Sequence, residues 1–258
     1  MTQLSTKEFI AIIPARLAST RLPNKPLADL GGKPMVVRTA ERALASGARR
    51  VIVATDDQRI AQACQQHGLE VAMTRTGHIS GTDRIAEVAD QAQLADDCVI
   101  VNVQGDEPLI DPALIAATAA LINPQIPMAS AAHPIHNLAE VFNPNVVKVV
   151  LDQQQRALYF SRAPIPWARD AFAQTEQAMP EGYPALRHIG IYAYRRDFLR
   201  QITALPPSQL ELIEALEQLR VIAHGFPIAM HLCASAPAAG VDTPEDLLRV
   251  QQIFASTK

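Results

Sequence analysis

The sequence has little of what marks several classes of protein. Its three cysteines, Cys64, Cys98 and Cys233, are widely spaced and form no C-x-x-C pair, so we expect reduced thiols in the core. No apolar run approaches the roughly 20 residues that cross a bilayer. Residues 1–8 also lack the apolar centre of a signal peptide, so we expect a cytoplasmic protein with no membrane insertion.

An excess of positive charge is absent as well. The formal net charge of the 258 residues is −3, which argues against nucleic acid as the main partner, because such binding needs a broad basic surface. The hydrophobic content of 48% is enough for one large α/β domain or two small ones. The composition therefore indicates a globular protein in which any cluster of cations has a local role.

Short apolar runs alternate with helical patterns over the first 103 residues. Strands are predicted at 9–13, 51–54, 69–73 and 98–103, the first ended by Pro14, which has no N–H to donate. Amphipathic helices are predicted between them, at 34–46, 57–67 and 82–94. This alternation predicts an α/β fold with a Rossmann-like, mostly parallel sheet flanked by helices, and with ligands at the carboxyl ends of the strands.

The pattern changes after residue 123. Strands are predicted at 128–133, 146–151, 156–160 and 189–194, with an irregular excursion from Pro164. A helix capped by Ser208 should run to about Ala223, and a last helix should start at Pro244. We therefore predict one domain over 1–258, with a first part at 8–123, a smaller β-rich lobe at 124–232 and a C-terminal return at 233–258.

The loop after the first strand carries three cations, Arg16, Arg21 and Lys25, and no acidic residue among them. Cations this close repel each other unless an anion sits between them, which favours a polyphosphate. The prolines of the loop stiffen it and lower the entropy cost of holding the cations together. A solvated basic surface is the alternative interpretation.

Two aspartates are candidate ligands of a hard cation. Asp106 follows the most apolar strand, and Asp242 lies just before the last helix. A carboxylate beside a bound triphosphate is well suited to hold Mg²⁺, which takes oxygen donors and shares its coordination sphere with phosphate. Each aspartate alone could equally be a turn or helix-cap carboxylate.

The basic loop has the motif P-A-R-x-x-S-T-R-L-P-x-K-P-L-x-x-x-x-G-K-P-M, which resembles the nucleotide-binding signature of sugar nucleotidyltransferases. The resemblance is strongest to the cytidylyltransferases of 3-deoxy-D-manno-octulosonate (Kdo). The segments V-N-V-Q-G-D-E-P, S-R-x-x-I-P-W, R-H-I-G-I-Y, L-E-Q-L-R and G-V-D-T-P-E-D-L resemble the same family. The similarity extends from Phe9 to Val250.

This resemblance implies a role for each matching residue. The nucleotide would be bound by Arg16, Arg21, Lys25, Arg75, Ser80 and Gln104. Mg²⁺ would be held by Asp106 and Asp242, which with Lys25 form the catalytic set. The sugar would be bound by Gln104, Arg162, His188, Tyr192, Glu217 and Gln218. The same resemblance, with the β-rich middle region, favours a homodimer and assigns sugar binding and dimerisation to residues 124–232.

Purely structural roles are the alternative interpretation for several of these residues. The loop with Arg75 and Ser80 could be an ordinary surface loop, Arg162 could be an ion-pair partner, and His188 could be a half-buried structural histidine. A guanidinium does, however, pair with a carboxylate through two parallel hydrogen bonds, which suits an acidic sugar.

The resemblance implies that CMP is transferred from CTP to the anomeric hydroxyl of Kdo, giving CMP-Kdo and pyrophosphate for lipopolysaccharide biosynthesis. A cytidylyltransferase for another acidic sugar, such as a sialic acid, would share the basic loop but need different sugar-side residues. A nucleotide-sensing module that binds without turnover belongs to a different class. The pair of aspartates argues against it, because a sensor need not hold a metal against the α-phosphate.

Overall fold

The computed structural model describes residues 8–17, 22–78 and 80–256 of the chain. By its internal contacts the chain divides into two compact units. Unit 1 comprises residues 1–120, 191–203 and 237–258, and unit 2 comprises residues 121–190 and 204–236. Strand β8 (Leu186–Arg195) passes from unit 2 into unit 1 at Gly190.

Unit 1 contains the predicted parallel sheet. Its strands are β1 (Phe9–Ala15), β2 (Arg50–Thr55), β3 (Glu70–Met73) and β4 (Val99–Asn102). They lie in the order β3-β2-β1-β4, all parallel, and the second half of β8 adds to β4 in the antiparallel sense. These strands are almost continuously apolar because helices cover both faces of the sheet.

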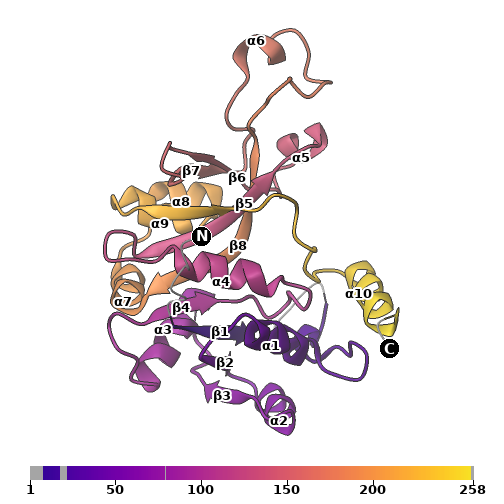
Figure 1. Cartoon of the computed structure of the whole chain (residues 1–258), viewed down its shortest axis with the longest axis vertical. Helices are drawn as coiled ribbons and strands as arrows, with labels where there is room; N and C mark the ends of the chain where they lie inside the picture. The colour runs from indigo at the N-terminus through magenta and orange to yellow at the C-terminus, as the bar shows by residue number, and fades with distance from the viewer. Residues whose placement is uncertain (1–7, 18–21, 79, 257–258) are drawn as a thin grey trace, which may run out of the picture. The chain divides into compact units, whose positions relative to one another are not determined.

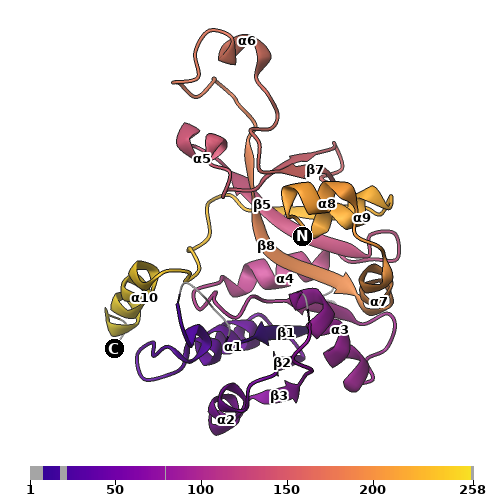
Figure 2. The ribbon, with the colours of Figure 1, turned by 180° about the vertical axis from the view of Figure 1, so that it is seen from behind.

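The helices of unit 1 are α1 (Met35–Ala45), α2 (Gln58–Gln66), α3 (Gly81–Gln91), α4 (Pro112–Ala120), α7 (Arg196–Ala204) and α10 (Pro244–Ser256). The short 3₁₀ helix η1 (Lys25–Leu27) precedes α1. Helices α1 and α4 lie on one face of the sheet and α3 on the other (Figures 1 and 2). The side chains of Asp57 and Ser80 accept from backbone N–H groups at the starts of α2 and α3 and so cap both helices.

Unit 2 is built on strands of both senses. Strand β5 (Met128–Pro134) pairs with β9 (Ile228–Leu232) in parallel, whereas β6 (Lys148–Leu151) pairs with β7 (Ala157–Ser161) and with β8 in the antiparallel sense. Its helices are α5 (Leu138–Phe142), α6 (Arg169–Phe172), α8 (Gln209–Glu214) and α9 (Gln218–Ala223). Helix α6 lies within a long irregular excursion between β7 and β8 (Figure 1).

Two details differ from the sequence-based predictions. Strand β1 continues through Pro14 to Ala15, because beyond Ile12 it is paired with β2 alone and a residue without an N–H is tolerated there. The helix predicted to run from Ser208 to about Ala223 is broken into α8 and α9 at Ala215, whose φ is 51°. Among the described residues, no helix combines the length and apolar character that crossing a bilayer would require.

Candidate active site

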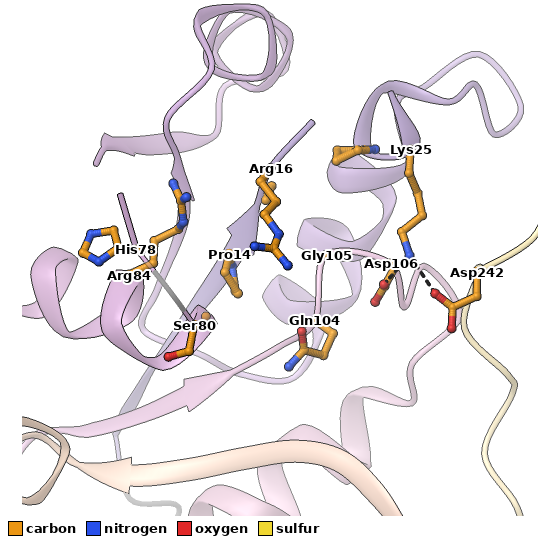
Figure 3. A pocket seen from close by; sticks show the side chains of 13 residues that line it. Pro14, Arg16, Lys25, His78, Ser80, Arg84, Gln104, Gly105, Asp106 and Asp242 are labelled. Atoms are coloured by element: carbon orange, nitrogen blue, oxygen red, sulfur yellow. Dashed lines mark hydrogen bonds and ion pairs between the residues drawn. The ribbon is translucent and has the colours of Figure 1, made fainter. Parts of the chain in front are cut away.

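A pocket of about 460 Å³ opens in unit 1 at the carboxyl ends of β1 and β4. The loops after β1, β3 and β4 meet there, as the parallel sheet predicts, and the segment before α10 joins them (Figure 3). The residues lining it include Pro14, Arg16, Lys25, His78, Ser80, Arg84, Gln104, Gly105, Asp106 and Asp242. The pocket is thus lined mainly by polar and charged side chains from distant parts of the chain.

Lys25 holds the two candidate aspartates together. Its ammonium Nζ lies 2.5 Å from Oδ2 of Asp106 and 2.9 Å from Oδ1 of Asp242 (Figure 3). Burial lowers the pKa of Lys25, but the charges and hydrogen bonds of Asp106 and Asp242 outweigh it, so the net shift is upward. Carboxylate oxygens from residues 136 positions apart therefore lie within reach of a single cation.

Two glycines allow these loops to approach each other. A Cβ on Gly105 would lie 2.9 Å from the carbonyl oxygen of Pro14, so only glycine lets the loop after β4 pass this close to β1. A Cβ on Gly240 would lie 3.2 Å from the carbonyl oxygen of Asp106. That same carbonyl accepts a hydrogen bond of 2.9 Å from the N–H of Val241. The backbone thus fixes Asp242 beside Asp106.

Helix α10 anchors Asp242 from the other side. Val241 and Val250 are fully buried in an apolar cluster with Leu30 and Met35, which follow η1 in the chain. The carboxylate of Asp246, in the first turn of α10, accepts hydrogen bonds from the N–H groups of Asp242 and Thr243. The segment that follows Lys25 and the segment that carries Asp242 therefore pack into the same hydrophobic cluster.

The loop after β3 forms another wall of the pocket. Ser80 and Asp83 make a reciprocal capping box that fixes the start of α3. The imidazole of His78 is bonded to the carboxylate of Glu87, and this carboxylate also pairs with Arg75 at 3.4 Å. The side chain of Arg75 is 80% exposed and is not part of the pocket lining, whereas Ser80 is.

The donor set fits a hard divalent cation. Within the described residues, no group of three or more His, Cys, Asp or Glu side chains is arranged to hold a metal, so the protein offers the two carboxylates alone. Mg²⁺ commonly takes one or two carboxylates and fills its sphere with phosphate oxygens and water. The positions of Asp106 and Asp242 therefore suit a metal that arrives with a nucleotide.

Glu107 is a residue that sequence reasoning missed. Burial, and then the nearby charges of Asp106 and Asp242, raise the pKa of Glu107 to about 7. Its carboxylate also lies against Gly240, as the near contact of a Cβ at that position shows. The sequence signal was its place beside Asp106, directly after the strand.

In unit 2, the guanidinium of Arg162 is bound by backbone carbonyls. Nε donates to the carbonyl oxygen of Glu214 at 2.7 Å, Nη1 to Pro144 at 3.0 Å and Nη2 to Ala215 at 3.4 Å. Arg162 thereby supplies donors to two carbonyls at the end of α8, where the predicted helix breaks at Ala215. Arg162 thus lies against the turn that leads into α9.

The other residues assigned to the sugar are distributed over the two units. His188 Nε2 lies 2.9 Å from Oγ of Ser130, and burial lowers the pKa of His188 to about 3, so the ring is neutral at pH 7. Glu217 immediately precedes α9, and Gln218 begins it. The Nε2 atom of Gln218 is buried and has no hydrogen-bond partner among the described residues.

The remaining predicted site residues belong to unit 1 or lie outside the described chain. Gln104 lines the pocket, between the end of β4 and Asp106. Tyr192 lies on β8 opposite Asn102 of β4, and its ring stacks on that of Tyr194. Arg21 lies outside the described residues.

Comparison with known proteins gives concordant findings. The family model of the cytidylyltransferases matches residues 10–228. A protein from Herminiimonas arsenicoxydans named 3-deoxy-manno-octulosonate cytidylyltransferase is 69% identical over 246 residues, which is 95% of this chain and 98% of that protein.

Solved structures agree with the fold. The structure of a CMP:2-keto-3-deoxy-manno-octonic acid synthetase complexed with CTP superposes with a TM-score of 0.88 at 44% identity, covering 97% of this chain and all of that one. A nucleotidyl transferase from Methanothermobacter thermautotroptrophicus gives a TM-score of 0.61 at 16% identity, covering 98% of this chain and 100% of that one. The second likeness concerns the fold alone, and together they confirm the predicted fold class.

Proposed function

The chain belongs to the cytidylyltransferase family, and on that premise we propose that it transfers CMP from CTP to Kdo and releases pyrophosphate. It is a nucleotidyltransferase, as its motifs predict. In the reaction the anomeric hydroxyl of Kdo forms a bond to the α-phosphorus of CTP while the bond between the α- and β-phosphates breaks. The electron pair of that bond leaves with the pyrophosphate.

One observation carries the mechanism: a single ammonium, that of Lys25, contacts both Asp106 and Asp242 inside the pocket. Phosphoryl-type transfers depend on positioning and on charge stabilisation more than on covalent chemistry by the protein. In the triphosphate complex, Lys25 and Arg16 would turn to the phosphates and stabilise the charge that builds up on the leaving pyrophosphate. Arg21 would assist them.

Asp106 and Asp242 would hold Mg²⁺. When bound there, the cation supplies positive charge beside the α-phosphate and lowers the pKa of the attacking hydroxyl. The task of the protein is then to keep two carboxylates close together before the ion arrives. The hydrogen bond from Val241 to the carbonyl of Asp106 and the anchoring of α10 do this.

Residues of unit 2 would recognise the sugar. Arg162 is the cation suited to its carboxylate, and the neutral ring of His188 can exchange hydrogen bonds with sugar hydroxyls without adding charge. The Nε2 atom of Gln218, buried and without a partner in the described part of the chain, supports the same role, because such a donor gains from an acceptor that a ligand brings. We also propose Gln104, Tyr192 and Glu217 as sugar contacts, and Arg75 and Ser80 as nucleotide contacts, from their matching motifs.

A homodimer and a cytoplasmic location are further parts of the proposal. The resemblance of the chain to its family supports both. Sedimentation equilibrium at micromolar concentration would show a mass near twice that of the 28.0 kDa chain. A monomer at that concentration would remove the dimer from the proposal.

A pyrophosphate-release assay over a small panel tests the function. The panel pairs CTP, UTP and ATP with Kdo and with a sialic acid, each with and without Mg²⁺. We expect release only with CTP, Kdo and Mg²⁺ together. Release with a sialic acid instead of Kdo would change the substrate, and CTP binding without release for any sugar would favour a nucleotide sensor.

A further inference from the structure

Lys148 is the one lysine of the described chain whose residue is completely buried. It lies at the start of β6, in the middle strand of the β7-β6-β8 ladder of unit 2. A buried ammonium is costly because its hydration is lost, and burial accordingly lowers the pKa of Lys148. A methionine would fill similar space without that cost, so the charge calls for a functional explanation.

The ammonium of Lys148 is bound by three backbone carbonyls. Nζ lies 2.6 Å from the carbonyl oxygen of Val146, 2.6 Å from that of Arg162 and 2.9 Å from that of Asn143. Arg162 is the proposed ligand of the sugar carboxylate. Lys148 therefore fixes the main chain of a residue that would contact substrate.

The register of the sheet places Lys148 between the two strands that carry predicted sugar contacts. It is paired with Ser161 on β7 and with Arg187 on β8. Arg162 directly follows β7, and His188 is the next residue of β8. Lys148 is thus paired, on each side, with the residue that directly precedes a proposed sugar ligand.

Glu214, the last residue of α8, holds Arg162 from the opposite side. Its Oε1 accepts from Oγ of Ser161 at 2.6 Å, and its Oε2 accepts from the N–H of Arg162 at 2.8 Å. The backbone N–H and the backbone carbonyl of Arg162 are therefore both bonded to ionisable side chains, those of Glu214 and Lys148. The guanidinium donates one N–H from each nitrogen, to the carbonyls of Glu214, Pro144 and Ala215. Two of its five N–H groups therefore have no acceptor among the described residues and are left for a carboxylate.

We propose that Lys148 and Glu214 are positioning residues for the acidic sugar, which act by fixing Arg162 in the conformation that receives the sugar carboxylate. The inference rests on the proposed function of the site. In this role the buried lysine and the glutamate at the end of α8 raise the affinity for the sugar without contacting it. Preorganised groups bind more tightly because less ordering remains to be done when the ligand arrives.

The test is a comparison of KM values in the Lys148→Met variant, measured by pyrophosphate release. We expect the KM for Kdo to rise about tenfold or more, because the loss of a charge-assisted hydrogen bond frees the main chain of Arg162. The KM for CTP should stay within about twofold, since such a change alters sugar positioning alone. Arg156→Ala, at an exposed arginine of unit 2 paired with Asp152, is the control and should change neither value.

A double-mutant cycle separates positioning from general loss of structure. If Lys148 acts through Arg162, then adding Lys148→Met to an Arg162→Ala background should raise the KM for Kdo by less than about twofold. Fully additive effects would overturn the inference. Equal KM values for Kdo in wild type and Lys148→Met would overturn it as well.

Glu214→Gln decides the matter if Lys148→Met does not fold. Glutamine keeps the shape but has one acceptor oxygen instead of two, so one of the bonds to Ser161 and Arg162 is lost. A rise of about threefold or more in the KM for Kdo with CTP unaffected supports the inference, and no rise overturns it. If the wild-type enzyme itself releases no pyrophosphate with Kdo, the proposed function fails instead, so the two failures are distinguishable.

Discussion

Lys25 in unit 1, which lines the pocket and is 14% exposed, and Lys148 in unit 2, which is buried, are held in opposite ways. Lys25 is bonded to the carboxylates of Asp106 and Asp242, which raise its pKa. Lys148 is bonded to backbone carbonyls, and burial lowers its pKa. The first lysine balances charges that would otherwise repel each other, and the second fixes the course of the chain.

The difference indicates which lysine can change partners. Carboxylates bonded to an ammonium can exchange it for a metal ion, and the ammonium can then turn to phosphates, so the arrangement around Lys25 suits a site that loads and releases ligands. The backbone carbonyls around Lys148 are neutral and buried, so we expect no metal ion to replace its ammonium. The arrangement around Lys148 therefore suits a permanent support, and chemistry and recognition are expected to respond to different mutations.

The largest effect is expected at the ammonium–carboxylate site. Asp106→Asn should lower kcat about a hundredfold or more, roughly 3 kcal/mol of lost electrostatic stabilisation, with the fold intact. Single-turnover pyrophosphate release measures the loss of kcat, and thermal melting checks that the fold is intact. Asp111→Asn is the control, because asparagine caps α4 as well as aspartate does. Near-normal turnover in Asp106→Asn would remove Asp106 from the mechanism.

A change in unit 2 should affect affinity for one substrate. Arg162→Ala should weaken Kdo binding by about 10- to 100-fold, the usual worth of a hydrogen bond to a charged group, and leave CTP binding unchanged. Isothermal titration with each substrate measures this. Arg156→Ala, in an exposed ion pair with Asp152, should alter neither. Weakened CTP binding with normal Kdo binding would mean that the two ligand sites are assigned the wrong way round.

The Lys25→Met variant tests whether the ammonium of Lys25 and a metal ion compete for the same two carboxylates. Removing the ammonium leaves two carboxylates facing each other, so the free protein should bind Mn²⁺ about tenfold more tightly while its affinity for CTP falls. Electron paramagnetic resonance of free Mn²⁺ reports the first value without any turnover. An unchanged Mn²⁺ affinity would show that Lys25 does not compete for the carboxylates. Arg156→Ala again serves as the control.

The smallest effect concerns pH. The pKa of His188 is about 3 in the fold and 6.5 when unperturbed, so below pH 6.5 the unfolded chain takes up a proton that the folded chain refuses. The stability contributed by the neutral ring is full above pH 6.5 and is lost as the pH falls toward 3, about 1.4 kcal/mol by pH 5.5. Urea unfolding of wild type and His188→Gln at pH 7.5 and 5.5 measures this, and the fall should be smaller in the variant.

Sequence reasoning predicted the fold of unit 1 and several of the residues that line its pocket, but not His78 and Arg84, and Arg75 lies outside the lining. Buried strands followed by polar loops have few possible arrangements, because right-handed crossovers bring the carboxyl ends of parallel strands to one edge. Asp106 could therefore be placed from its position after β4. The enzyme class is confirmed, whereas the magnesium ion, the dimer and the individual contacts with substrates remain predictions.

Unit 2 was harder to predict because its decisive interactions are distant in sequence. Ala215 is a strong helix former, and nothing near it signals a left-handed conformation. The carbonyls at the break, those of Glu214 and Ala215, accept from Arg162, more than 50 residues earlier in the chain. Lys148 was likewise read as an ordinary strand residue, since its three acceptors are backbone atoms that leave no trace in the pattern of side chains.

The packing of α10 has a practical consequence for making the recombinant protein. Val250 and Phe254 secure this helix against the segment around Leu30 and Met35, and Asp242 directly precedes the helix. Truncation from residue 250 onward would strip that anchorage and leave Asp242 on a loose tail. A version shortened in this way would bind metal poorly, so the C-terminus, which follows Asp242 closely in sequence, is a poor place to trim for crystallisation.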